Sequence, residues 1–488
     1  MFKAILEDKM AKSTTLIESS FKDFQARLIS AAKDDTSDIK NKIYGQRARL
    51  IPLNDKTEKG CEKNLTSIFL TSLTLIKEFR NMVSKEIDLK RGGTLHAYTE
   101  VAFPDLAMYY NIKGKGKRDL DIVDGLLLVV SSGTIKDAAF FEMKSHDSPL
   151  DPEQVERYIE LAKQLGIDKL VTVSNQFVTS SRYSPLNMKY PSDFNLFHLS
   201  WHYINTMGKI LWEDNDTNII DEDQKAIMYE VTQYFDHEKS GVKDFSSTGR
   251  TWEKAIDGID KGIVDPLDPY YSQAVVSWIQ EERDIALKLS QHLGYVIDSQ
   301  KKKYSSLQSR IEDETNLLLT TEKFQSEFKI KHAVSNMVVE ADVHGKNISV
   351  SVVVQNPEGA STYSQLKFVK NQLDGKCEKK NPERFKKLQK DLVLEVFFKG
   401  RISSIPFGYE NYDEQEYKIK AIGKEKKAVI KQVRITYKMN YGTTLFKSRT
   451  KFIKKFEEQV LTFYQVIVQN LKNGKIATPQ IENLETED

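Results

Sequence analysis

The chain has 488 residues, of which 40% are hydrophobic and 29% are charged, with a formal net charge of +2 at pH 7. This composition indicates a globular protein of several domains and excludes a largely disordered chain. Two cysteines alone, Cys61 and Cys377, exclude a disulfide framework and a cysteine-rich metal site. Because the sequence shows neither a signal-peptide core nor an apolar run of about 18 residues, we expect a cytoplasmic protein without membrane contact.

In chain order, the sequence predicts four segments. Residues 1–92 form an N-terminal helical region, with helices over 10–33 and 62–86. Within the second of these helices, apolar residues recur at helical spacing, a pattern typical of core packing. The remaining segments are an α/β domain over residues 93–262, a long helical connector over 263–325 and an α+β domain over 326–488.

A basic loop leads into the α/β domain. The cations Lys113, Lys115, Lys117 and Arg118 alternate in part with glycines, and Glu100 lies a short distance upstream. Glycines let a backbone approach a ligand closely, and cations suit phosphates. The loop is therefore predicted either to contact a nucleic-acid backbone or to be an ordinary solvated hairpin.

The next stretch predicts two strands with charged residues at their ends. Asp121 and Asp124 begin the first strand, and the second strand, over residues 138–144, ends in Glu142 and Lys144. Side chains two apart on a strand share a face, so Glu142 and Lys144 should project together. Burying a carboxylate and an ammonium costs free energy unless each has a partner or a function.

A helix and a third strand follow. Asp151 is a suitable N-cap, Pro152 suits the first helical position, and Gly166 is placed to end the helix. Residues 169–173 then predict a strand. The order strand, strand, helix, strand indicates an α/β core with acidic residues at its edge.

This arrangement resembles the PD-(D/E)XK nuclease superfamily. The residues that carry the resemblance are Asp124 or Asp121, followed by Glu142-x-Lys144 on the second strand. The resemblance covers roughly residues 93–205 and implies a restriction-endonuclease-like mixed-sheet core within an α/β protein. One departure is that no proline precedes either aspartate, which leaves the identity of the first acid open.

The resemblance also implies a function. Asp124 and Glu142, with Asp121 as the alternative acid, would hold Mg²⁺ or Mn²⁺, because hard cations prefer oxygen ligands. Lys144 would orient or activate the attacking water and offset charge on the phosphorane. The expected activity is a metal-dependent endonuclease acting on DNA, double-stranded in the simplest case. A structural Glu–Lys pair on a half-buried strand is the alternative interpretation.

Further residues match elements of some superfamily members. Gln154 and Tyr158, four apart on the predicted helix, resemble a Q-x-x-x-Y element, which implies a catalytic role for Gln154 and a nucleic-acid contact for Tyr158. Glu100 resembles the additional acid that many members place on their first core helix. Bacterial restriction or anti-phage defence is expected by association alone. The alternative function is a catalytically inactive nuclease-fold protein that binds nucleic acid or acts as a scaffold.

The C-terminal half predicts self-association. Apolar residues over 270–320 recur at helical spacing, which indicates one long helix or a hairpin of two helices broken at Gly294. A single helix of that length cannot bury its apolar stripe alone, so we expect a homodimer assembled through this segment. Residues 367–401 are basic, and either a nucleic-acid arm or a solvated face fits that composition.

Overall fold

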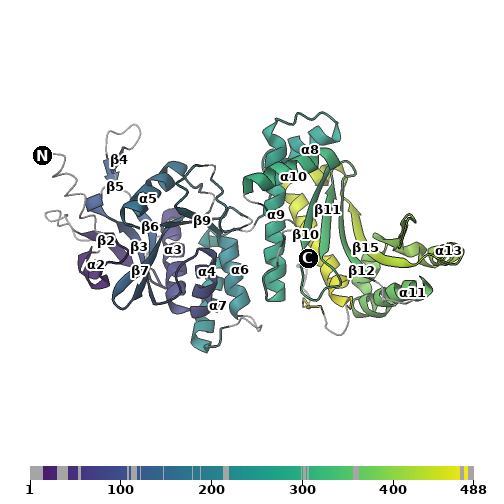
Figure 1. Cartoon of the computed structure of the whole chain (residues 1–488), viewed down its shortest axis with the longest axis horizontal. Coiled ribbons are helices and arrows are strands. Elements are labelled where there is room, and N and C mark those ends of the chain that lie inside the picture. Colours follow the sequence, from purple (N-terminus) through teal and green to yellow (C-terminus); the bar gives the residue numbers. More distant parts are fainter. Residues whose placement is uncertain are drawn as a thin grey trace. The chain divides into compact units, whose positions relative to one another are not determined.

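The computed structural model describes the chain except residues 1–14, 30–41, 53–56, 107–108, 112–117, 121, 147, 179, 187, 213–218, 244, 298, 300–303, 305–306, 356–361, 473–477 and 482–488. It divides into two compact units, Met1–Asp244 and Phe245–Asp488. The first unit is built on a seven-stranded mixed sheet and the second on a six-stranded antiparallel sheet (Figure 1). Mixed α/β architecture is therefore confirmed. Among the described helices, none combines the length and apolar character needed to cross a bilayer.

These two units replace the four segments expected from the sequence. Residues 1–92 are not a separate helical region, because they contribute strands to the first sheet and a helix that packs on it. Residues 245–262 belong to the second unit, as does the whole segment over 263–325. The glycines and prolines near residue 260 mark turns inside the second unit and not a boundary.

The sheet of the first unit runs in the order β1-β2-β3-β6-β7-β8-β9. Its strands are β1 (Leu28–Ile29), β2 (Ile43–Arg47), β3 (Thr94–Ala102), β6 (Val123–Ser131), β7 (Thr134–Met143), β8 (Lys169–Ser174) and β9 (Asn195–Ser200). Strands β3, β6 and β7 pair antiparallel, whereas β7, β8 and β9 run parallel. The short strands β4 (Tyr109–Asn111) and β5 (Arg118–Leu120) pair with each other.

Helices cover both faces of this sheet. They are α2 (Phe21–Arg27), α3 (Glu58–Leu75), α4 (Lys77–Glu86), α5 (Pro152–Gln164), α6 (Trp201–Trp212) and α7 (Glu222–Asp236). Phe69 of α3 packs edge-on against Phe141 of β7, while Tyr158 of α5 joins the cluster around the adjacent Phe140. Because successive strand residues point to opposite faces, α3 and α5 lie on opposite sides of β7.

The local signals for α5 are confirmed, and two helix predictions are wrong. Asp151 accepts a hydrogen bond from the Glu153 amide at 3.0 Å, and Gly166 has a φ of +72° just after the helix.

Of the helix predicted over 10–33, the described residues are helical only over Phe21–Arg27, and Leu28–Ile29 form strand β1. The single helix predicted over 62–86 is instead α3 and α4, divided by the extended backbone of Ile76. The Ile76 side chain is fully buried, so the apolar period continues through a break that it cannot reveal.

The second unit has the strand order β10-β11-β12-β15-β13-β14. The strands are β10 (Lys323–Phe328), β11 (Met337–Asp342), β12 (Asn347–Gln355), β13 (Leu392–Phe398), β14 (Ile405–Gly408) and β15 (Ile430–Asn440). The helices are α8 (Trp252–Asp260), α9 (Pro269–Leu293), α10 (Leu307–Thr321), α11 (Thr362–Gln372), α12 (Pro382–Gln389), α13 (Tyr412–Glu425), α14 (Gly442–Lys447) and α15 (Arg449–Val466).

The helical segment over 270–320 is a pair of helices packed inside its own unit. Gly294 follows α9 with a φ of +68°, a conformation that favours glycine, and α10 returns against α9. Val275, Trp278 and Leu289 of α9 are buried in the core shared with the second sheet. The apolar stripe over 270–320 is therefore buried within its own unit. It gives no support to the predicted homodimer.

Gly93 provides a test of how tightly β3 meets β6. It has a φ of +124°, and a Cβ placed there would lie 2.5 Å from the carbonyl oxygen of Val130. We expect Gly93→Ala to destabilise the first unit by about 1–3 kcal/mol, the usual cost of such backbone strain. Gly92→Ala is the matched control, because its Cβ would have no atom within 4 Å. Hydrogen exchange of β3 and β6 amides in urea measures both, and equal protection in the two variants would contradict the expectation.

Candidate active site

The register between β6 and β7 places two carboxylates together. Gly125 pairs with Phe141, so one position further along Asp124 lies opposite Glu142. The Asp124 Oδ2 atom accepts a hydrogen bond from the Met143 amide at 2.8 Å. Glu142 is fully buried, whereas Asp124 retains partial exposure. Asp124, one of the two candidate acids, therefore faces Glu142.

Lys144 completes this group of charges. Its ammonium donates to Glu142 Oε1, two residues earlier on the same side of the chain. Its backbone is held from two directions: the Lys144 amide donates to the Val173 carbonyl of β8 at 2.8 Å, and Trp201 Nε1 donates to the Lys144 carbonyl at 2.7 Å. The end of β7 is thus fixed by the neighbouring strand and by α6.

Glu62 on α3 is a site residue that the sequence analysis missed. Its Oε2 atom accepts a hydrogen bond from the Ser145 amide at 3.0 Å, and its Oε1 atom lies 3.9 Å from Lys144 Nζ. The sequence pattern of α3 is the apolar spacing of a packed helix. Glu62 lies 80 residues before Glu142, and no sequence motif links the two positions. No local pattern would have found it.

Glu100 lies on strand β3 and not on a helix, so its expected placement is corrected. Thr99 pairs with Gly125 and Val101 with Val123, which puts Glu100 level with Asp124 on the next strand. Glu100 has a φ of +54° and forms an ion pair with Lys63 of α3. A non-glycine residue in this conformation stores strain of about 1–3 kcal/mol, and such strain concentrates at functional sites.

Gln154 and Tyr158 hold the start of β6 in place. Gln154 Nε2 donates to the Tyr158 hydroxyl at 2.9 Å, and that hydroxyl donates to the carbonyl oxygen of Ile122. Tyr158 is only 1% exposed, so the direct nucleic-acid contact predicted for it does not fit the structure. It is a positioning residue for the chain next to Asp124.

Other predicted site residues cannot be placed. Asp121, Lys113, Lys115 and Lys117 lie outside the described residues, and so does the side chain of Arg118, although its backbone belongs to β5.

A cavity of about 200 Å³ opens beside this cluster. Its lining combines charged, polar and apolar residues from five separate stretches of chain: Glu62, Lys63, Thr66, Glu100, Ile122, Asp124, Lys144 and Gln154. Clefts with a few convergent charged groups are the usual location of active sites. The cavity gives a ligand access to Asp124 and to Lys144, the two charged residues next to the buried Glu142.

The charges strongly perturb one another. Burial raises the pKa of Glu142 well above its usual range, and the nearby Asp124 charge raises it further. Burial also raises the pKa of Asp124, against the opposing effect of Lys144. Burial alone would lower the pKa of Lys144, but the Glu142 and Asp124 carboxylates outweigh it, so its pKa is raised. Lys144 therefore remains an ammonium at neutral pH.

The carboxylates fit a hard divalent cation. Glu142 Oε2 is buried and has no hydrogen-bond partner among the described residues, although Oε1 is paired with Lys144. Two carboxylates close together repel unless a proton or a cation lies between them. Asp124 and Glu142 supply the oxygen ligands that Mg²⁺ and Mn²⁺ prefer. The site thus has a donor set and an unmet charge that both suit such a cation.

The raised pKa of Glu142 gives a pH-dependent stability. Between the ordinary glutamate pKa and the raised value, the folded state binds more protons than the unfolded state, so stability falls as pH rises. In EDTA, Glu142→Gln should therefore stabilise the first unit at pH 8 by about 1–2 kcal/mol and flatten its pH profile. Urea unfolding at pH 5 and pH 8 measures this, with the exposed Glu160→Gln as control. A less stable Glu142→Gln at pH 8 would contradict the expectation.

Comparisons with known proteins add no identification. No family model, no curated protein and no solved structure matches this chain. Function is therefore inferred below from the geometry and chemistry of the cluster around Glu142.

Proposed function

We propose that the first unit is a metal-dependent nuclease that hydrolyses phosphodiester bonds in DNA. The observation that carries the proposal is the group formed by Asp124, Glu142 and Lys144: the fully buried Glu142 leaves one carboxylate oxygen without a hydrogen bond among the described residues, and Asp124 and Lys144 line a cavity. Structural ion pairs normally satisfy both partners. An unsatisfied buried carboxylate oxygen is better explained by a ligand that binds there.

The topology around the cluster supports this proposal. Helix α3, the antiparallel strands β3, β6 and β7, then α5 and the parallel strand β8 follow the order of a restriction-endonuclease-like core. In the resemblance described above, an aspartate is followed by Glu-x-Lys on the next strand, and then by a helix and another strand. Asp124 near the start of β6, Glu142 near the end of β7, helix α5 and strand β8 follow that order.

The three charged side chains of the cluster would have different chemical roles. Asp124 and Glu142 would hold the cation, which supplies Lewis-acid polarisation of the phosphate and a water of lowered pKa. Lys144 carries its proton at neutral pH, so it acts as a cation that orients the water and stabilises negative charge on the phosphorane. It does not serve as a general base.

Neighbouring residues position these groups. Glu62 fixes the Ser145 amide directly after Lys144, and the Gln154–Tyr158 pair fixes the Ile122 carbonyl two residues before Asp124. Helix α3 therefore holds the backbone that follows Lys144, and helix α5 holds the backbone that precedes Asp124. DNA as the substrate and a role in bacterial defence rest on the family resemblance alone.

Cleavage assays test the proposal directly. We expect the wild-type chain to cleave plasmid or linear DNA with Mg²⁺ or Mn²⁺ and to be inactive in EDTA, with RNA as a parallel substrate. Glu142→Gln should abolish cleavage, because it removes a ligand charge at nearly constant shape. Lys144→Met should lower kcat by about 100- to 1,000-fold, as for other preorganised stabilising groups.

Control variants distinguish the loss of a metal ligand from a general loss of folding. Asp124→Asn should be inactive and Asp121→Asn active, whereas the opposite result would make Asp121 the ligand. The exposed Glu160→Gln should cleave normally. Wild-type turnover by Glu142→Gln would overturn the site assignment, and DNA binding by an uncleaving wild-type chain would favour an inactive nuclease-fold binding protein.

Glu62 provides a separate test of positioning. We expect Glu62→Gln to lower activity by about 10- to 100-fold, in the range of residues that orient metal ligands, and to raise the Mg²⁺ concentration needed for half-maximal activity. A Mg²⁺ titration of cleavage rates measures both. An unchanged Mg²⁺ dependence would show that Glu62 only supports the fold.

A further inference from the structure

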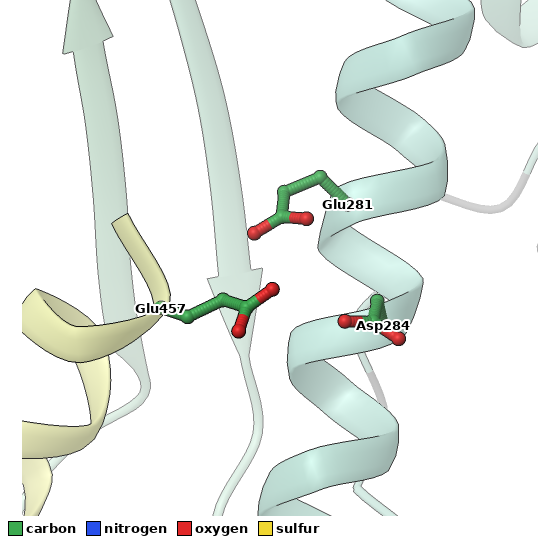
Figure 2. A group of neighbouring side chains, drawn as sticks. All are labelled: Glu281, Asp284 and Glu457. Carbon is green, nitrogen blue, oxygen red and sulfur yellow. The ribbon is translucent and has the colours of Figure 1, made fainter. Parts of the chain in front are cut away.

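A second group of buried carboxylates lies in the second unit. Glu281 and Asp284 project from α9, and Glu457 projects from α15 on the other side of the gap between these helices (Figure 2). One carboxylate oxygen from each residue lies within 4.8 Å of the others. Residues from two helices, more than 170 positions apart in sequence, thus bring three acids to one point inside the unit.

One cation is shared among these acids. Lys288 Nζ lies 2.7 Å from Asp284 Oδ2 and 2.8 Å from Glu457 Oε2. Its pKa is raised because the Asp284 and Glu457 carboxylates outweigh the opposing effect of burial. Three carboxylates and one ammonium leave a net charge of −2 when all are ionised.

Glu281 is the acid that this lysine does not satisfy. Its side chain is 1% exposed, and neither carboxylate oxygen has a hydrogen-bond partner among the described residues. Figure 2 shows its carboxylate directed toward Glu457. The nearby Tyr441 hydroxyl donates instead to Gln459, whose amide in turn donates to the Ile348 and Tyr437 carbonyls.

The adjacent residue shows how the same helix satisfies a structural acid. Glu282 is 3% exposed, yet its Oε1 atom accepts from Arg310 at 2.9 Å and its Oε2 atom from Ser326 at 2.6 Å. Two neighbouring glutamates of α9 are therefore equally buried, and only Glu282 is fully paired. Burial by itself therefore does not explain why both carboxylate oxygens of Glu281 lack a hydrogen-bond partner among the described residues.

We propose that Glu281, Asp284 and Glu457 bind a hard divalent cation of about the size of Ca²⁺. The donors are all carboxylate oxygens, which select hard cations. Ca²⁺ bonds oxygen at about 2.3–2.6 Å and so spans two oxygens up to about 5 Å apart, which is the range of the oxygen–oxygen distances in the cluster. A doubly charged ion also neutralises the net charge of −2.

The bound cation would link α9 to α15 inside the second unit. These helices pack on the second sheet, and Trp278 of α9 stacks on Phe456 of α15 one residue from Glu457. The site is thus structural, and it is independent of the nuclease proposed for the first unit. An alternative state, a proton held on Glu281, is an outcome of the test below.

The test uses the full-length chain carrying Glu142→Gln, so that the first unit contributes no carboxylate pair to calcium binding. After EDTA treatment, equilibrium dialysis against Ca²⁺ should show one bound equivalent, with a Ca²⁺-dependent rise in the Tm of the second unit. Adding Glu281→Gln, or separately Glu457→Gln, should remove both. Glu282→Gln is the matched control: it should lower the Tm but keep the bound equivalent and the Ca²⁺-dependent rise.

Two results would overturn the proposal. One is a Glu281→Gln chain that retains the calcium equivalent. The other is a parent chain that binds no Ca²⁺. If that chain is also no less stable after Glu281→Gln, Glu281 holds a proton in the folded state, because the neutral amide mimics the protonated acid. Failure of DNA cleavage by the wild-type chain would leave this proposal untouched, since dialysis and Tm do not depend on it.

Discussion

The pairing of β6 with β7 is the constraint on which the candidate active site depends. Because Gly125 lies opposite Phe141, Asp124 and Glu142 meet at the open end of the two strands, and Lys144 follows on the same side. Ionised carboxylates in such a place cost free energy that one lysine offsets only in part. Negative charge that Lys144 does not compensate remains at the unpaired Oε2 atom of Glu142, and a cation could bind there.

The elements around this pair hold it from several directions. Helix α3 contributes Glu62 from one face, α5 contributes Tyr158 from the other, and α6 holds the Lys144 carbonyl through Trp201. The left-handed backbone of Glu100 on β3 adds strain at the same location. Such strain persists only where surrounding contacts over-determine the conformation, which is the condition for a preorganised site.

The buried glutamates of the two units differ in how many of their carboxylate oxygens are paired. Glu282 has a guanidinium and a hydroxyl, and it requires no further partner. Glu142 has a lysine on one oxygen alone, and Glu281 has no hydrogen-bond donor among the described residues. Since each unpaired buried charge is costly, the two incompletely paired acids mark places where a cation would release that cost.

The sequence by itself determined what depends on neighbours along the chain. The cap at Asp151, the end of α5 near Gly166 and the shared face of Glu142 and Lys144 follow from local hydrogen bonding and strand alternation. The tertiary structure alone decided the break at Ile76, the contribution of Glu62 and the burial of α9 within its own unit. These depend on which distant surfaces pack together, and side-chain periodicity carries no information about the identity of the packing partner.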